Sequence, residues 1–257
     1  MNNKAKFRKI YLLPNFLTIV NIFFGYLSLS ATFRGKFLRA AFWILMAAVL
    51  DAFDGIIARA TRTHSDFGIQ LDSLADAFSF ATASSFLIYF WGFGQVHPSS
   101  IGVFFSFIFL IAGILRLARY NAFQKFKIDR KYYTGLTAPS ASLFLVAIVL
   151  KYPEPVKGTL HTLLIAILVL GLSLCMISTI KYRNFLNFNF HQIIDPKTSL
   201  IIAIIISSLI IFPKVGLLVL FSFNVASGPS TQVFNFFKKK TLKRSSQKEA
   251  EISHEKN

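Results

Sequence analysis

Four aspartates beside long apolar runs constrain this chain more than any other feature. Asp51 and Asp54 end one apolar run, and Asp72 and Asp76 begin the next. The members of each pair are three or four residues apart, so on helices they lie on one face. The pattern predicts two helices whose carboxylate pairs can point into a common space. The two apolar runs are residues 42–50 and 77–91.

The cost of placing these carboxylates in lipid indicates that something neutralises them. An ionised aspartate near the centre of a bilayer costs about 2.5 to 3.5 kcal/mol, so four would cost on the order of 10 kcal/mol. Arg59 and Arg62 could form a structural ion-pair network with them, but two arginines cannot balance four carboxylates. Oxygen ligands suit Mg²⁺ or Mn²⁺, and two such ions cancel four negative charges. We therefore favour a metal site over a purely structural cluster.

The whole chain has the composition of a membrane protein. Of its residues 54% are hydrophobic and only 15% are charged, which is too apolar for an ordinary soluble domain. We expect an all-α fold, a polytopic membrane helix bundle of about eight transmembrane helices, because each crossing takes about 20 residues. The expected spans are residues 16–33, 40–57, 69–91, 101–117, 133–150, 163–180, 200–212 and 215–225.

The charge distribution predicts the partners and the orientation. A net charge of +17 could suggest nucleic acid, but the basic residues lie mainly between apolar runs and at the two ends. Membrane lipid is the expected partner, with no nucleic acid, and both termini and the aspartates are expected at the cytoplasmic face of a bacterial-type inner membrane. A basic start before an apolar run also fits a signal peptide, which the further apolar runs disfavour.

Three parts follow from these patterns. We expect a basic cytoplasmic N-terminus at residues 1–13, a transmembrane catalytic domain at residues 14–230, and a basic cytoplasmic tail at residues 231–257. The tail is charged and poor in apolar residues, so it is expected to be disordered. The single cysteine, Cys175, lies in an apolar run, and no disulfide framework is expected.

Arg116 and Arg119 are further candidates for the site. They are three residues apart at the end of the fourth expected span, where they should lie level with the aspartates. They could hold a phosphate or a substrate carboxylate by bidentate contacts. The basic residues that follow them are explained by the positive-inside rule.

A longer pattern surrounds the aspartates and carries a resemblance. The pattern is D-x2-D-G-x2-A-R-x8-G-x3-D-x3-D, and it resembles the signature of the CDP-alcohol phosphatidyltransferases. Eight fixed positions at set spacing are far more specific than a lone glycine motif. The matching residues are Asp51, Asp54, Gly55, Ala58, Arg59, Gly68, Asp72 and Asp76.

Other segments resemble the phosphatidylserine synthase branch of this family. They are the Arg-Leu-Ala-Arg-Tyr-Asn run at 116–121, the Tyr-Thr-Gly-Leu-Thr-Ala-Pro run at 133–139 and the Ser-Gly-Pro run at 227–229. Thr137 stands where that branch usually has the first proline of an aromatic-x-Gly-Leu-Pro-x-Pro run. The resemblance is sharp only at the aspartates.

The resemblance implies a reaction and a set of roles. The four aspartates would share two Mg²⁺ or Mn²⁺ ions on the pyrophosphate of CDP-diacylglycerol, and Asp76 would also be the catalytic base for the hydroxyl of L-serine. Phosphatidylserine would form, CMP would leave, and the protein would pair as a homodimer. The residues implied in binding CDP-diacylglycerol are Asn15, Gly55, Arg59 and Ser65.

Two alternatives stay open from the residues. Glycerol 3-phosphate or inositol phosphate would also use cations such as Arg116, so the acceptor is not decided by the arginines. In a different class, clustered aspartates on membrane helices could belong to a cation transporter or a proton relay. Only the enzyme predicts metal-dependent release of CMP.

Overall fold

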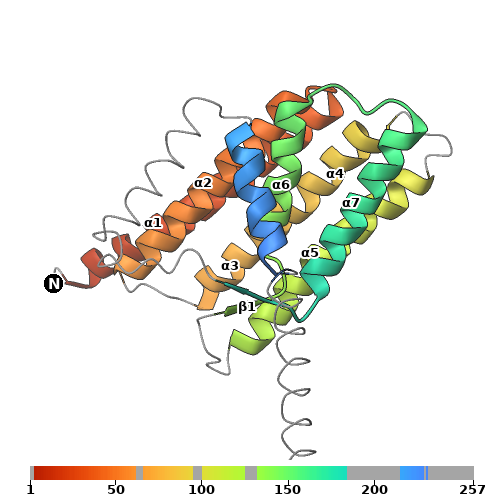
Figure 1. Ribbon diagram of the computed structural model, residues 1–257. Helices are drawn as coiled ribbons and strands as arrows, with labels where there is room; N and C mark the ends of the chain where they lie inside the picture. The colour runs from red at the N-terminus through yellow and green to blue at the C-terminus, as the bar shows by residue number, and fades with distance from the viewer. Residues whose placement is uncertain are drawn as a thin grey trace, which may run out of the picture.

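The computed structural model describes residues 3–61, 66–94, 100–124, 132–183, 215–228 and 230, which form a bundle of helices with one two-stranded sheet (Figure 1). Within these ranges, five helical stretches are long and apolar enough to cross a membrane: Asn15–Phe33, Phe37–Ile57, Phe67–Phe93, Ser100–Ala122 and Thr159–Ile177. The prediction of a polytopic helical membrane protein is therefore confirmed.

The number of spans stays a prediction. Two further apolar helices are described, Ala138–Lys151 and Val215–Gly228, and both are shorter than a full crossing. The expected span at residues 200–212 lies outside the described residues. The elements in chain order are α1 (Asn3–Phe33), α2 (Phe37–Thr61), α3 (Asp66–Asp76), η1 (Ala77–Thr82), α4 (Ala83–Ile88), η2 (Tyr89–Phe93), α5 (Ser100–Gln124), β1 (Tyr132–Thr134), α6 (Ala138–Lys151), α7 (Thr159–Ile177) and β2 (Lys181–Arg183).

The first two helices form an antiparallel hairpin. Gly35 closes α1 with a φ of 68°, a left-handed conformation that glycine adopts without strain. The Gly35 and Lys36 amides donate to the carbonyls of Thr32 and Ala31, the pattern of a Schellman motif. Three of the six residues described as buried on α2 are alanines, Ala40, Ala41 and Ala47, which lets the helices approach closely.

The third expected span is a continuous helical stretch whose winding changes along its length. It begins as α3, widens to the π-helical η1 directly after Asp76, and continues through α4 and the π-helical η2. In η1 the hydroxyl of Thr82 donates to the carbonyl of Ala77 at 3.0 Å. Wider turns of this kind change which side chains share a face of the helix.

The second half of the bundle packs α5, α6 and α7 around its own apolar core. Phe109 of α5, Leu145 of α6 and Val169 of α7 are among its fully buried members. The strands β1 and β2 pair antiparallel beside this core, with Tyr133 opposite Tyr182. Neither strand was expected from the sequence.

The bundle has two distinct ends. The end of α2, the start of α3, the end of α5 and β1 lie toward the lower part of the view, near the start of α1 (Figure 1). At the other end, two hydrogen bonds join Trp91 to the loop after α6. The Trp91 carbonyl accepts from the Val156 amide, and the Trp91 indole N–H donates to the Tyr152 carbonyl at 2.9 Å. The aspartates, on the last part of α2 and on α3, thus lie at the end of the bundle away from Trp91.

Candidate active site

Three of the four aspartates converge. One carboxylate oxygen from each of Asp51, Asp72 and Asp76 lies within 4.8 Å of the others, and all three side chains are half-buried. Asp51 comes from α2, whereas the other two come from α3 at an i,i+4 spacing. The two helices therefore deliver their carboxylates to one place, as the sequence spacing predicts.

Asp54 lies beside this group without being one of the three. It is only 7% exposed, and its Oδ2 accepts a 2.6 Å hydrogen bond from the hydroxyl of Thr18 on α1. Its charge acts on the carboxylates of Asp51, Asp72 and Asp76. The four negative charges thus form one electrostatic cluster.

The cluster fits a divalent cation. Oδ1 of Asp54 and Oδ1 of Asp76 are both buried and have no hydrogen-bond partner among the described residues. Buried carboxylate oxygens without partners are costly, and a cation that they coordinate removes that cost. The buried Arg116 lies where its positive charge acts on Asp76. This single positive charge cannot balance four carboxylates. The donor set is all oxygen, which suits a hard cation.

Arg116 and Arg119, predicted together, lie in different surroundings. Arg116 is 7% exposed, and its guanidinium lies 5.4 Å from the ring centre of Tyr120. Arg119 donates to the carbonyls of Met176, Ile177 and Ser178 at 2.6 to 3.2 Å. These carbonyls are left without partners where α7 ends, so Arg119 caps that helix.

Sequence reasoning missed the contacts that align the helices of the site. Asn121 of α5 donates to the hydroxyl of Ser73 at 2.8 Å, beside Asp72. Thr18 of α1 likewise donates to Asp54, which lies 36 residues further along the chain. A polar side chain inside an apolar run was the available signal, but it does not name the partner.

The comparison with known families decides the assignment. The family model described as CDP-alcohol phosphatidyltransferase matches residues 11–177, which contain the four aspartates, Thr18, Arg116 and Arg119.

The chain belongs to the CDP-alcohol phosphatidyltransferase family.

Members of this family transfer a phosphatidyl group from CDP-diacylglycerol to an alcohol, so the protein is a transferase of the membrane.

Several curated relatives of this family member are named for the formation of a serine lipid. A CDP-diacylglycerol–serine O-phosphatidyltransferase of Helicobacter pylori is 36% identical over 182 residues, which are 68% of this chain and 73% of the relative. One of Methanocaldococcus jannaschii is 32% identical over 180 residues, 70% and 78% of the two chains. An archaetidylserine synthase of Methanothermobacter thermautotrophicus is 32% identical over 184 residues, 71% and 74% of the two chains.

Of the four residues predicted to bind CDP-diacylglycerol, the structure of this phosphatidyltransferase describes three, on α1 and α2. Gly55 follows Asp54 on α2, and a Cβ built there would have no atom within 4 Å. Asn15 is half-buried on α1. Arg59 lies in the last part of α2, and Ser65 falls outside the described residues. Their roles stay predictions.

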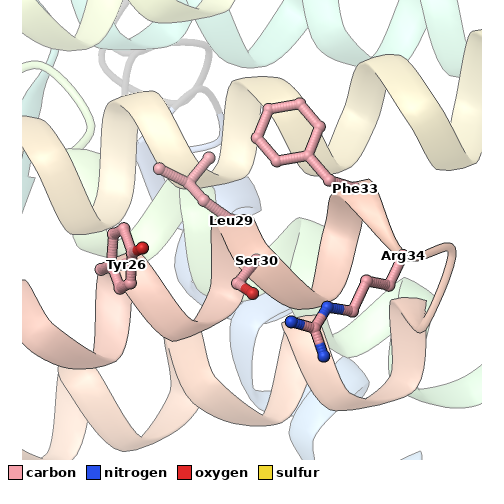
Figure 2. Close-up of a pocket in the computed structure, with 5 residues that line it drawn as sticks. All are labelled: Tyr26, Leu29, Ser30, Phe33 and Arg34. Carbon is pink, nitrogen blue, oxygen red and sulfur yellow. The ribbon is translucent and has the colours of Figure 1, made fainter.

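A surface hollow at the other end of α1 is separate from this site. It has a volume of about 320 Å³ and is lined by Tyr26, Leu29, Ser30, Phe33 and Arg34 (Figure 2). Ser30 lies 12 residues beyond Thr18, roughly 18 Å along the helix at about 1.5 Å per residue. None of the four aspartates lines this hollow.

Proposed function

We propose that this protein transfers the phosphatidyl group of CDP-diacylglycerol to the hydroxyl of L-serine, giving phosphatidylserine and CMP. The observation that carries the proposal is the convergence of Asp51, Asp72 and Asp76 from two apolar helices of a CDP-alcohol phosphatidyltransferase. The names of the relatives support serine as the acceptor. Family membership favours transfer over the transport of cations.

Asp51, Asp54, Asp72 and Asp76 would together hold two Mg²⁺ or Mn²⁺ ions. This number matches four carboxylate charges, and the partnerless oxygens of Asp54 and Asp76 are ready ligands. When bound, such ions neutralise pyrophosphate charge and polarise the phosphoryl group under attack.

Asp76 is the proposed catalytic base. Its carboxylate would take the proton of the serine hydroxyl while the serine oxygen forms a bond to the phosphorus of the phosphatidyl group. The bond from that phosphorus to the CMP oxygen breaks, and CMP leaves with the electron pair. Asp76 is half-buried and its Oδ1 is buried, which would limit bulk water as a competing acceptor.

The remaining residues would bind and orient the two substrates. Asn15, Gly55, Arg59 and Ser65 are proposed to bind CDP-diacylglycerol, in agreement with the open space beside Gly55. Arg116 is the better candidate for the serine carboxylate because it is buried and acts on Asp76. Arg119 remains a weaker candidate, since its guanidinium already binds three carbonyls.

The proposal also concerns placement and assembly. The active site would face the cytoplasm at a bacterial-type inner membrane, which the basic residues that follow the fourth expected span in the sequence support. Residues 14–230 would form the catalytic domain, with a basic N-terminus at 1–13 and a basic tail at 231–257. The protein would act as a homodimer.

An acceptor assay tests the function. Purified protein is given CDP-diacylglycerol with Mg²⁺ or Mn²⁺, and L-serine, glycerol 3-phosphate, inositol and inositol phosphate are offered in parallel. Of the four acceptors, we expect only serine to support metal-dependent CMP release, with phosphatidylserine as the lipid product. Product from another acceptor, with none from serine, would refute the serine assignment but not phosphatidyl transfer. No CMP release with any acceptor would refute the proposed reaction.

A further inference from the structure

Thr18 joins α1 to the aspartate cluster through one buried hydrogen bond. Thr18 is 3% exposed and Asp54 is 7% exposed, and the hydroxyl donates to Asp54 Oδ2 at 2.6 Å. A hydrogen bond to a carboxylate is short and strong, and it is stronger where water is excluded. This contact therefore restrains the orientation of the Asp54 carboxylate.

The bond divides the two oxygens of Asp54 between two tasks. Oδ2 is held by Thr18, whereas Oδ1 is buried and has no hydrogen-bond partner among the described residues. A carboxylate held through one oxygen presents the other in a defined direction. Groups that hydrogen-bond to a metal ligand in this way tune both its orientation and its affinity for the metal.

A second contact holds α1 against the helix that carries Asp76. The hydroxyl of Ser79, in η1, donates to the carbonyl of Asn21 at 3.1 Å. A Cβ on Gly25 would lie only 2.6 Å from that hydroxyl, so α1 and η1 approach closely here. Because η1 directly follows Asp76, α1 contacts both α2, through Asp54, and the helical stretch that carries Asp76. The two contacting residues of α1, Thr18 and Asn21, are about one helical turn apart.

From these contacts we infer that Thr18 is a positioning residue for the metal ligand Asp54, and that it sets the metal affinity of the site. It acts through the hydrogen bond to Oδ2. The inference rests on the proposed metal-dependent function. A threonine that merely stabilised the fold would influence unfolding without influencing metal affinity.

The test compares three threonine variants in purified protein. Thr18→Val keeps the side-chain shape and removes the donor, whereas Thr18→Ser keeps the donor. Thr32→Val is the matched control, because Thr32 is a buried threonine of α1 whose hydroxyl has no hydrogen-bond partner among the described residues. Equilibrium Mn²⁺ binding is measured by electron paramagnetic resonance of the free ion, together with thermal unfolding and the Mn²⁺ concentration for half-maximal CMP release.

We expect Thr18→Val to weaken Mn²⁺ binding by about 10- to 100-fold, the usual effect of removing a group that orients a metal ligand. Thr18→Ser and Thr32→Val should bind Mn²⁺ like the wild type. An unchanged affinity in a folded Thr18→Val protein would overturn the inference, even if its unfolding temperature fell.

Two further outcomes keep the test decisive. If Thr18→Val does not fold, Thr18→Ala replaces it, because alanine also removes the donor and needs less space than threonine. Wild-type affinity in Thr18→Ala would then overturn the inference. Absence of Mn²⁺ binding by the wild type would instead refute the proposed metal-dependent function, a result distinct from loss in the variant alone.

Discussion

At the scale of single residues, the four aspartates of the site have the same side chain but different contacts. Three carboxylates converge, those of Asp51, Asp72 and Asp76. Asp54 accepts a hydrogen bond from Thr18 and interacts with the other carboxylates electrostatically. Identical carboxylates therefore differ in what they contact. Their contacts, and not their residue type, separate Asp54, which Thr18 orients, from the three carboxylates that converge.

Asp76→Asn should abolish CMP release while leaving the fold and the binding of CDP-diacylglycerol largely intact. Asparagine has nearly the same shape but cannot accept the proton, and loss of a general base typically costs about 10² to 10⁴ in rate. The measurements are steady-state CMP release and binding of CDP-diacylglycerol. The control is Glu154→Gln, an exposed acid in the loop after α6. A rate within tenfold of the wild type would exclude Asp76 as the base.

At the scale of elements, the loop before α6 depends on the end of α7. Gly135 has a φ of 82°, its amide donates to the carbonyl of Ile180, and the Leu136 amide donates to the carbonyl of Cys175. Arg119 from α5 binds the same end of α7. Three helices that reach the aspartate end are thus joined through backbone carbonyls.

Gly135→Ala should destabilise this junction by more than about 1 kcal/mol, because a side chain is strained at positive φ. Its Cβ would also lie 2.4 Å from the Met176 carbonyl oxygen and 2.6 Å from Arg119 Nη2. Gly171→Ala is the matched control: Gly171 lies within α7 and its Cβ would have no atom within 4 Å. Thermal unfolding of both variants checks this. Equal unfolding temperatures would contradict the proposed importance of the junction.

At the scale of the whole molecule, a charged cluster is held inside an apolar bundle. The described spans contain few charges other than the four aspartates, and small residues such as Ala40 and Ala141 allow their helices to pack closely. Repulsion among the carboxylates opposes this packing. A bound cation would therefore stabilise the bundle as well as serve the reaction.

Removal of divalent metal should lower the unfolding temperature, and Mn²⁺ or Mg²⁺ should restore it. A ligand that binds only the folded state adds about 2.7 kcal/mol of stability at 100 times its dissociation constant. The measurement is thermal unfolding in lipid nanodiscs after chelation and after titration with metal. Asp51→Asn should reduce the response because it removes a proposed metal ligand. A metal-independent unfolding temperature would argue against a metal site.

The sequence alone determined the class of fold and the family. Long apolar runs require helices in lipid because backbone groups find no water there, and this part of the prediction was confirmed. The spacing of Asp72 and Asp76 predicted that they share a face of their helix, and both are in the converging group, since helix geometry is local. The number of spans could not be settled in the same way, because α6 is too short for a full crossing and residues 200–212 are outside the described chain.

Only the tertiary structure decided which side chains meet across the helices. Thr18 and Asp54 are 36 residues apart, and Arg119 meets the end of α7 across 57 to 59 residues. Nothing in the local pattern distinguished Arg116 beside Asp76 from Arg119 at those carbonyls. Rotation and depth of each helix set these contacts, and both depend on packing against neighbouring helices, which periodicity along one segment does not contain.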